Sequence, residues 1–399
     1  MIAPMPGLSK PPLKPSRPFF SSGPCAKPPG WSPSWLANAK VGRSHRSADG
    51  LAAIRDLISS LSRLLELPSG YRLAIVPGSD TGAFEMALWS LLGPRGVDVF
   101  AWDVFGRQWV RDVIEELKIA DAAIRDAPFG RLPDFSAARP DRDIVFTANG
   151  TTSGVRVADF DWIAADRQGL VFCDATSAVF AQDLEWPKLD VVTFSWQKCL
   201  GGEAAHGILI LSPRAVARLR NHVPSWPVPK LFRLARPGHF DEALFEGHTI
   251  NTPSMLCVED CAQAVRWADS AGGGAGLKAR ASRNASLVRE WIARSDWAAD
   301  PVADARTGSL TSVVIGFADA RFGQLEEPAQ RRFVAELCSL LEAEGAAFDI
   351  AGHRGGPPCL RIWTGPTVEA DDIEAALPWL DWAYYSTCAT AGLDPSGQP

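Results

Sequence analysis

The chain has 399 residues, which at roughly 150 residues per domain predicts two or three domains. Hydrophobic residues make up 46% and charged residues 22%, the balance of a globular protein that buries a sizeable core. A net charge of −6 argues against a nucleic-acid-binding protein with a basic face and against a polybasic membrane anchor.

The two ends of the chain differ from its middle. Residues 1–16 and 388–399 lack periodicity, so we expect a proline-rich disordered tail at the start and a second disordered tail at the end. Neither a signal peptide nor a run of about 18 apolar residues is found, so the cytoplasm is the expected location. The eight cysteines form no CxxC pair, and we expect small buried residues and no metal site.

From residue 51 onward, amphipathic helices alternate with short apolar runs. Helices are predicted at 51–65, 83–92 and 108–117, and strands at 72–76, 97–102, 143–147, 170–173, 191–194 and 207–211. Such short, almost wholly apolar runs are typical of strands covered on both faces, which favours a mostly parallel sheet. The pattern predicts a large α/β domain over residues 17–267, with its first residues free to pack on a smaller domain.

The pattern of predicted helices and strands changes after about residue 268. The glycine-rich residues 271–276 indicate a flexible joint or a loop. A long helix to about residue 295, a strand at 310–317, a helix at 328–344 and a strand at 359–363 follow. These elements predict a small α+β domain over residues 268–387.

Two charged residues follow predicted strands. Lys198 comes after an apolar strand, and Asp174 ends another. Ligands of open α/β sheets bind beyond the carboxyl ends of strands, so the two side chains are expected to face one crevice. A lysine that forms a Schiff base and a carboxylate that keeps a pyridine nitrogen protonated suit pyridoxal phosphate chemistry. Taken singly, Lys198 could be a loop lysine and Asp174 a cap or turn residue.

The cofactor phosphate needs donors at a helix N-terminus, and residues 79–82 lie between a predicted strand and a helix. Backbone amides and Thr81 are the expected donors. Asp80 carries the wrong charge to contact a phosphate directly and is expected to cap the helix, and we count it with Thr81 among the cofactor-binding residues of this turn.

Five motifs together resemble the phosphoserine aminotransferase family, and the resemblance covers roughly residues 17–385. They are Phe20-Ser21-Ser22-Gly23-Pro24, Ser44-His45-Arg46, Ser195-Trp196-Gln197-Lys198, Asn251-Thr252-Pro253 and Gly352-His353-Arg354. The resemblance implies a class V, fold type I pyridoxal phosphate enzyme, with a mostly parallel seven-stranded sheet sandwiched by helices and a smaller α+β C-terminal domain.

The resemblance also implies roles for cofactor-binding residues. Lys198 would be the Schiff-base lysine, Gln197 would contact the cofactor phosphate, and Asp174 would pair with the pyridine nitrogen. Trp109 would stack on the ring and Thr151 would bind the ring hydroxyl region. By residue type alone, Trp109 is a core residue and Thr151 a turn hydroxyl.

Further implied roles concern the substrate and the assembly. Asn251 and Thr252, otherwise a helix cap before a proline, would reach the cofactor phosphate of the partner subunit, so the expected assembly is a homodimer with shared active sites. Arg361 would bind the substrate carboxylate. The pairs His45-Arg46 and His353-Arg354, otherwise surface features, would bind the substrate phosphate.

The chain departs from the family pattern at two places. The loop at 79–82 lacks the glycine- and arginine-rich form of many bacterial members, and residues 152–154 lack an acidic residue that many relatives carry. The first departure indicates a divergent branch of the family, and the second leaves the contacts to the ring hydroxyl open.

The implied reaction moves an amino group between phosphoserine and 2-oxoglutarate, giving 3-phosphohydroxypyruvate and glutamate in serine biosynthesis. The resemblance also allows 4-phosphohydroxy-threonine as a substrate in pyridoxine biosynthesis. Three alternatives remain: a serine- or alanine-glyoxylate aminotransferase, a cysteine desulfurase using Cys359, and a cofactor-binding regulator without catalysis.

Overall fold

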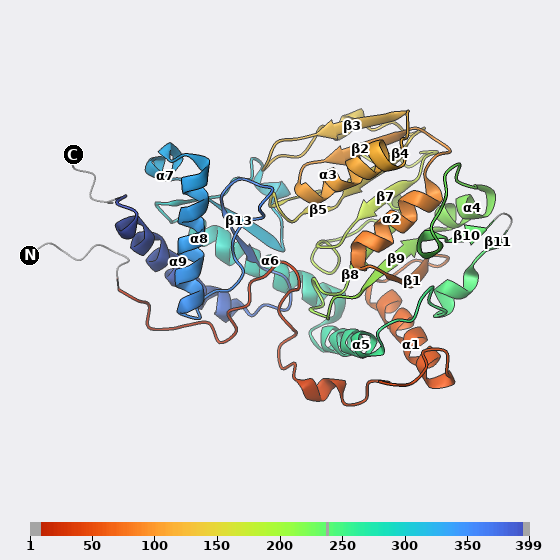
Figure 1. Cartoon of the computed structure of the whole chain (residues 1–399), viewed down its shortest axis with the longest axis horizontal. Coiled ribbons are helices and arrows are strands. Elements are labelled where there is room, and N and C mark those ends of the chain that lie inside the picture. Colours follow the sequence, from red (N-terminus) through yellow and green to blue (C-terminus); the bar gives the residue numbers. More distant parts are fainter. Residues whose placement is uncertain (1–8, 237–238, 394–399) are drawn as a thin grey trace, which may run out of the picture.

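A computed structural model describes residues 9–236 and 239–393 (Figure 1). Its centre is a seven-stranded sheet with the strand order β1-β9-β8-β7-β4-β2-β3. The strands are β1 (Arg72–Pro77), β2 (Val97–Ala101), β3 (Ala122–Asp126), β4 (Asp143–Thr147), β7 (Val171–Asp174), β8 (Val191–Ser195) and β9 (His206–Leu211). Only β9 runs antiparallel to its neighbours, so the prediction of a mostly parallel sheet is confirmed.

Helices cover both faces of this sheet. The helices α2 (Ser79–Leu91), α3 (Val104–Arg111) and α4 (Pro213–Asn221) share one core with Val76, Val99 and Val145. The other face, which includes Ile75 and Phe146, packs with α1 (Ala48–Leu64) and α5 (Met255–Ser270). Successive strand residues point to opposite faces, which is why apolar runs rather than alternating patterns mark these strands.

The C-terminal part contains a three-stranded antiparallel sheet, β12 (Ala298–Ala299), β13 (Ser312–Phe317) and β14 (Leu360–Trp363). Its helices are α6 (Gly273–Ile292), α7 (Ala320–Gln324), α8 (Glu327–Ala343) and α9 (Ala370–Thr390). Two further two-stranded sheets pair β5 (Asn149–Gly150) with β6 (Val155–Arg156), and β10 (Ala235–Arg236) with β11 (His239–Phe240). In the described residues, no helix has the length and hydropathy needed to cross a membrane.

The glycine-rich stretch is not a long flexible joint. The helix α5 ends at Ser270 and α6 begins at Gly273, so only Ala271 and Gly272 connect them, and Gly272 adopts a left-handed φ of 97°. The predicted boundary between residues 267 and 268 therefore falls inside the last turn of α5. We propose the connection between α5 and α6 as the boundary between an α/β and an α+β domain.

The expectation of a disordered N-terminal tail fails for residues 9–16. Ser16 donates to Asp372 of α9 through both its backbone N–H, at 2.7 Å, and its hydroxyl, at 2.8 Å, and the indole of Trp379 donates to the carbonyl of Leu13. Lys14 pairs with Glu344. Residues 9–16 are therefore held by tertiary contacts and not by regular secondary structure, so no hydrophobic periodicity in the sequence indicates their order. Residues 1–8 lie outside the described residues.

The second predicted tail, residues 388–399, also begins too early. Cys388 is buried within α9, which continues to Thr390. Residues 394–399 lie outside the described part of the chain, so that portion of the prediction is untested.

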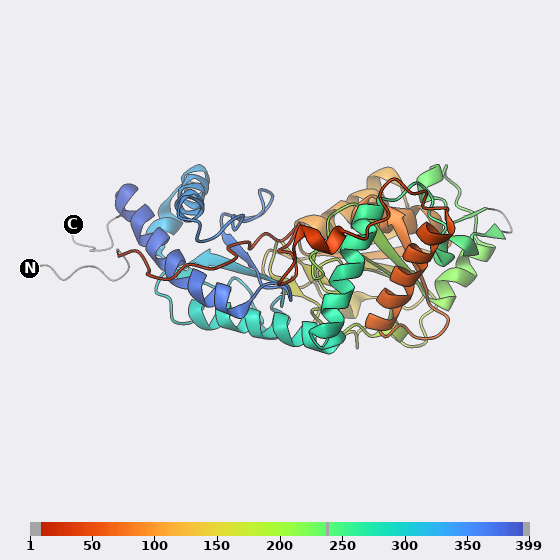
Figure 2. The same ribbon diagram turned by 90° about the horizontal axis from the view of Figure 1, so that it is seen from below.

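The N-terminal segment connects both parts of the molecule (Figure 2). It passes from α9 across to the α/β part, where the buried Asp260 of α5 accepts hydrogen bonds from Lys27 at 2.8 Å and from the Trp31 indole at 2.9 Å. Asp260 also accepts from the backbone N–H of Glu203 at 2.7 Å, which lies just beyond Lys198 in the chain. One carboxylate thus ties the segment to the loop that carries the lysine.

We expect Asp260→Ala to lower the free energy of unfolding by about 3 kcal/mol, because it leaves the N–H donors of Trp31 and Glu203 without their acceptor and Lys27 with only the exposed Glu203 carboxylate. Urea denaturation at fixed protein concentration measures the change. Asp269→Ala on the same helix removes a more exposed ion pair with Arg63 and should have only a small effect. Equal losses for the two variants would contradict the role of Asp260.

Candidate active site

A cavity of about 140 Å³ opens at the carboxyl ends of β4, β7 and β8, beside the N-terminus of α2. Its walls combine hydroxyl, amide, carboxyl and aromatic side chains with one lysine. The lining residues are Ser79, Asp80, Thr81, Phe105, Gln108, Trp109, Thr147, Asn149, Thr151, Asp174, Thr176, Ser177, Ser195, Gln197 and Lys198. This is the crevice that the order of strands and charged residues predicted.

Lys198 enters the cavity from the loop after β8. Its ammonium donates a 2.6 Å hydrogen bond to the carbonyl of Ser22 in the N-terminal segment. The loop is held close because the backbone N–H of Cys25 donates to the carbonyl of Gln197, and a side chain at Gly201 would collide with the carbonyl of Ala26. The lysine therefore lies in a fixed position under the N-terminal segment.

Asp174, the last residue of β7, lies in the same cavity with both carboxylate oxygens engaged. Oδ2 accepts from the indole N–H of Trp109 at 3.0 Å, and Oδ1 accepts from the backbone N–H of Thr176 at 3.0 Å. Trp109 also packs against Phe84, with ring centroids 4.6 Å apart. The hydrogen bond from Trp109 to Asp174 was not predicted; Trp109 is both a core residue and a wall of the cavity.

Asp80 is not the helix cap that we expected. The N-cap of α2 is Gly78, with a left-handed φ of 83° and no side-chain cap, and among the described residues no backbone N–H donates to the Asp80 carboxyl. The side chain is buried and faces Asp174, Thr176 and Thr193. Burial and then the charge of Asp174 raise the pKa of Asp80 well above its usual range.

Thr151 belongs to a buried hydroxyl network that sequence reasoning did not find. Its Oγ1 lies 2.6 Å from Oγ of Ser177, to which the amide of Asn149 donates at 2.8 Å. Thr311 of the α+β part donates to the carbonyl of Ser177 at 2.8 Å. Asn149 lies two residues after the end of β4 at Thr147, and this position is the one signal that could have identified it.

Three expected substrate-binding residues, Arg361, His353 and Arg354, come from the α+β part, and none of them is among the residues that line the cavity. Arg361 on β14 is half-buried and approaches the carbonyl of Thr151 at 3.5 Å. Burial lowers the pKa of its guanidinium. His353 packs edge-on against Phe105, which lines the cavity, with ring centroids 5.8 Å apart. The neighbouring Arg354 is exposed.

The remaining expected residues do not reach this cavity within one chain. His45 is buried and Arg46 exposed in the turn before α1, and Asn251 and Thr252 lie in the turn before α5. In the described part of the chain, neither turn contributes to the cavity lining.

The cavity walls carry polar atoms that need partners. Within residues 9–236 and 239–393, seven buried side-chain atoms in or beside the cavity have no hydrogen-bond partner of good geometry. They are Asp80 Oδ1, Thr147 Oγ1, Asn149 Oδ1, Thr176 Oγ1, Thr193 Oγ1, Ser195 Oγ and Gln197 Oε1. Such a concentration of unsatisfied groups is expected where a polar ligand completes the hydrogen bonding. The four hydroxyls of this set could donate to a small polar cofactor that carries an aldehyde and a phosphate.

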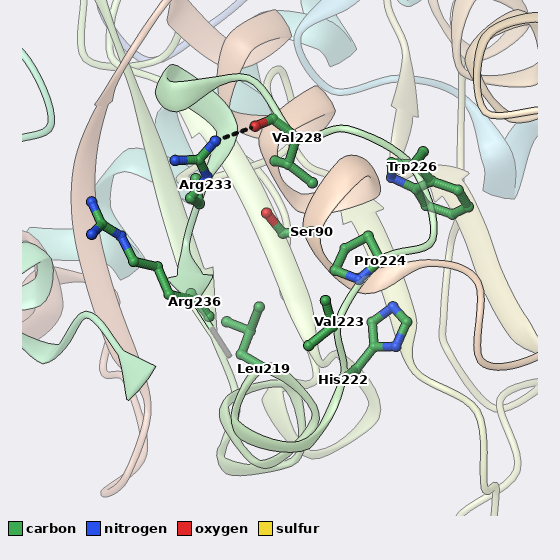
Figure 3. Close-up of a pocket in the computed structure, with 10 residues that line it drawn as sticks. Ser90, Leu219, His222, Val223, Pro224, Trp226, Val228, Arg233 and Arg236 are labelled. Atoms are coloured by element: carbon green, nitrogen blue, oxygen red, sulfur yellow. Dashed lines mark hydrogen bonds between the residues drawn. The ribbon is translucent and has the colours of Figure 1, made fainter. Parts of the chain in front are cut away.

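Pocket size alone would not have identified this cavity as the candidate active site. A larger pocket of about 440 Å³ lies between α2, α4 and residues 223–236, lined by Ser90, His222, Trp226 and Arg233 among others (Figure 3). It shares no lining residue with the cavity at Lys198. The chemistry of the side chains, rather than volume, identifies the candidate active site.

Comparison with known proteins identifies the family to which the chain belongs. No family model matches the chain. The chain is 48% identical over 375 residues to a phosphoserine aminotransferase of Methanosarcina mazei and 46% identical over 377 residues to that of Methanosarcina barkeri, covering 94% of this chain and 99% of each relative.

Solved structures with the same fold are more distant. A phosphoserine aminotransferase of Cytophaga hutchinsonii aligns over 91% of this chain and 98% of its own, with a TM-score of 0.76 at 22% identity. A pyridoxamine-pyruvate aminotransferase of Mesorhizobium loti, with a TM-score of 0.75 at 17% identity, covers 95% and 94%. The fold is therefore shared by aminotransferases with different substrates, and the family follows from the close relatives: this chain belongs to the phosphoserine aminotransferase family.

Proposed function

We propose that this chain is a pyridoxal-phosphate-dependent phosphoserine aminotransferase that moves an amino group between phosphoserine and 2-oxoglutarate. The observation that carries the proposal is that Lys198 and Asp174 line the same polar cavity. The chain that holds this cavity is 46–48% identical to proteins named phosphoserine aminotransferase. We further propose that the protein is a cytoplasmic homodimer that acts in serine biosynthesis. A second role, in pyridoxine biosynthesis, is part of the same proposal.

When bound, pyridoxal phosphate supplies an aldehyde that takes up the amino group and a ring that accepts electrons. Lys198 would hold the cofactor and then move the proton from Cα of the substrate. Asp174 would keep the pyridine nitrogen protonated, since a carboxylate favours the charged form of a nearby base. Gln197, Thr81 and the first amides of α2 would bind the phosphate.

The substrate would be bound by cations from two chains. Arg361 would bind the carboxylate through two parallel N–H donors, and His353 with Arg354 would bind the phosphate. We propose that His45 and Arg46 of a second copy complete the phosphate site, and that Asn251 and Thr252 of that copy reach the cofactor phosphate. Their absence from the residues that line the cavity of their own chain supports this arrangement.

The rival functions fit less well. A cysteine desulfurase needs a nucleophilic thiolate, but Cys359 is buried and burial raises its pKa to about 11. A glyoxylate aminotransferase would give the two His-Arg pairs no task. A cofactor-binding regulator would also use Lys198, but nothing in the sequence resembles a DNA-binding module.

We expect Lys198→Ala to reduce glutamate formation from phosphoserine and 2-oxoglutarate by at least about a thousandfold, because the variant lacks the proton-transfer amine. A coupled assay for glutamate measures the rate, and the visible absorbance of lysine-linked cofactor should disappear. Lys278→Ala, which removes only an exposed ion pair with Asp183, is the matched control. Substantial turnover by Lys198→Ala would sink the assignment.

Arg354→Ala should lower kcat/KM for phosphoserine roughly ten- to a hundredfold, the range expected for one lost charge-assisted contact. The weak activity toward unphosphorylated serine should change little, because that substrate has no phosphate. Steady-state kinetics with both substrates distinguish the effects. If both activities fell equally, Arg354 would support the structure and not bind phosphate.

Hybrid dimers test whether Arg46 acts in trans. Lys198→Ala and Arg46→Ala should each impair phosphoserine turnover, but a hybrid dimer contains one site with both residues intact. Unfolding and refolding an equal mixture should therefore restore about a quarter of the wild-type rate, since about half the dimers are hybrids with one intact site. Mixing Lys198→Ala with Arg43→Ala, which lacks only an exposed ion pair with Asp49, should give about half the wild-type rate, because a quarter of the dimers are then active Arg43→Ala homodimers in addition to the hybrids. No restoration with Arg46→Ala would mean that Arg46 serves its own chain or neither.

A further inference from the structure

Two buried carboxyl groups face each other in the cavity, and the proposed reaction uses only one of them. Asp80 comes from the first turn of α2 and Asp174 from the end of β7. Both are at most 6% exposed, and each lies close enough for its charge to act on the other. The turn at 78–82 thus brings an acid to the position where a phosphate would be expected.

The surroundings of Asp80 disfavour a second negative charge. Burial and the charge of Asp174 oppose ionisation of its carboxyl more strongly than the hydroxyls of Thr176 and Thr193 favour it. Its Oδ1 has no hydrogen-bond partner of good geometry. Two carboxyl groups that interact in one buried cavity do not readily both ionise, so the pair retains one proton at neutral pH.

The hydrogen bonds decide which residue keeps that proton. Asp174 accepts from the Trp109 indole and from the Thr176 backbone, and both donors favour the ionised carboxylate. Among the described residues, no N–H group donates to Asp80, so its carboxyl has the weaker support for a charge. The proton therefore belongs mainly to Asp80.

We propose that Asp80 is a positioning residue which, as a neutral acid, donates a hydrogen bond to the Asp174 carboxylate and holds that carboxylate in place for the pyridine nitrogen. This inference rests on the proposed function, because the pyridine is the cofactor's. It also explains how an aspartate can occupy a phosphate-binding turn: a neutral side chain does not repel the phosphate, and the amides at the N-terminus of α2 remain available.

The protonation state is tested on cofactor-free protein by infrared difference spectroscopy. At about pH 8.5, above the pKa of about 6 of the buried Asp103, the wild type should show the carbonyl stretch of a neutral carboxylic acid that Asp80→Asn lacks. Thr81→Ala, at the next position of the same turn, should keep the band. Absence of the band from the wild type would overturn the proposal, whatever cofactor the protein uses.

Cofactor affinity then tests the donor role. The amide of Asp80→Asn can still donate to Asp174, so its dissociation constant for pyridoxal phosphate should stay within about threefold of wild type, whereas Asp80→Ala should weaken binding at least about tenfold. Quenching of tryptophan fluorescence on titrating the apoprotein measures both. Equal losses in the two variants, or no loss in Asp80→Ala, would contradict the proposal. If the wild type failed to bind pyridoxal phosphate, the proposed function would fail, while the infrared band would still report on the carboxyl pair.

Discussion

The register of three parallel strands determines the chemistry of this site. Thr147 of β4 pairs with Asp174 of β7, which pairs with Thr193 of β8, so three polar side chains end side by side at one edge of the sheet. Because strand side chains alternate between faces, a slip of one residue would turn Asp174 away from Trp109. The apolar residues that precede these positions, buried on both faces, make such a slip unfavourable.

The N-terminal segment adds a second constraint, since it contacts both parts of the molecule. It hydrogen-bonds to Asp372 in the α+β part and to Asp260 in the α/β part, and between these anchors the carbonyl of Ser22 accepts from Lys198. A relative displacement of the two parts is therefore transmitted to the backbone that contacts the lysine. This arrangement links the α+β part, whose Arg361 and His353 we propose to bind the substrate, to the backbone that contacts Lys198.

The shared fold does not determine which substrate is selected. We expect individual side chains around the cavity to do so. Aminotransferases named for pyridoxamine and pyruvate, or for aspartate, have the same overall architecture. In this chain, Arg361 and His353 reach the cavity region from the C-terminal part, while His45 and Arg46 lie elsewhere in the same chain.

The sequence by itself determined the fold class, most central strands and the pairing of Lys198 with Asp174, because buried parallel strands leave continuous apolar runs that end at polar residues. The edge strand β3 and helix α9 were missed: β3 is only half-buried, and α9 is buried on several sides, so neither shows a regular pattern. Tertiary structure alone decided that residues 9–16 are held and that Asp80 faces Asp174 instead of capping α2. Both outcomes depend on contacts between residues that are far apart in the chain. The local sequence pattern cannot predict such contacts.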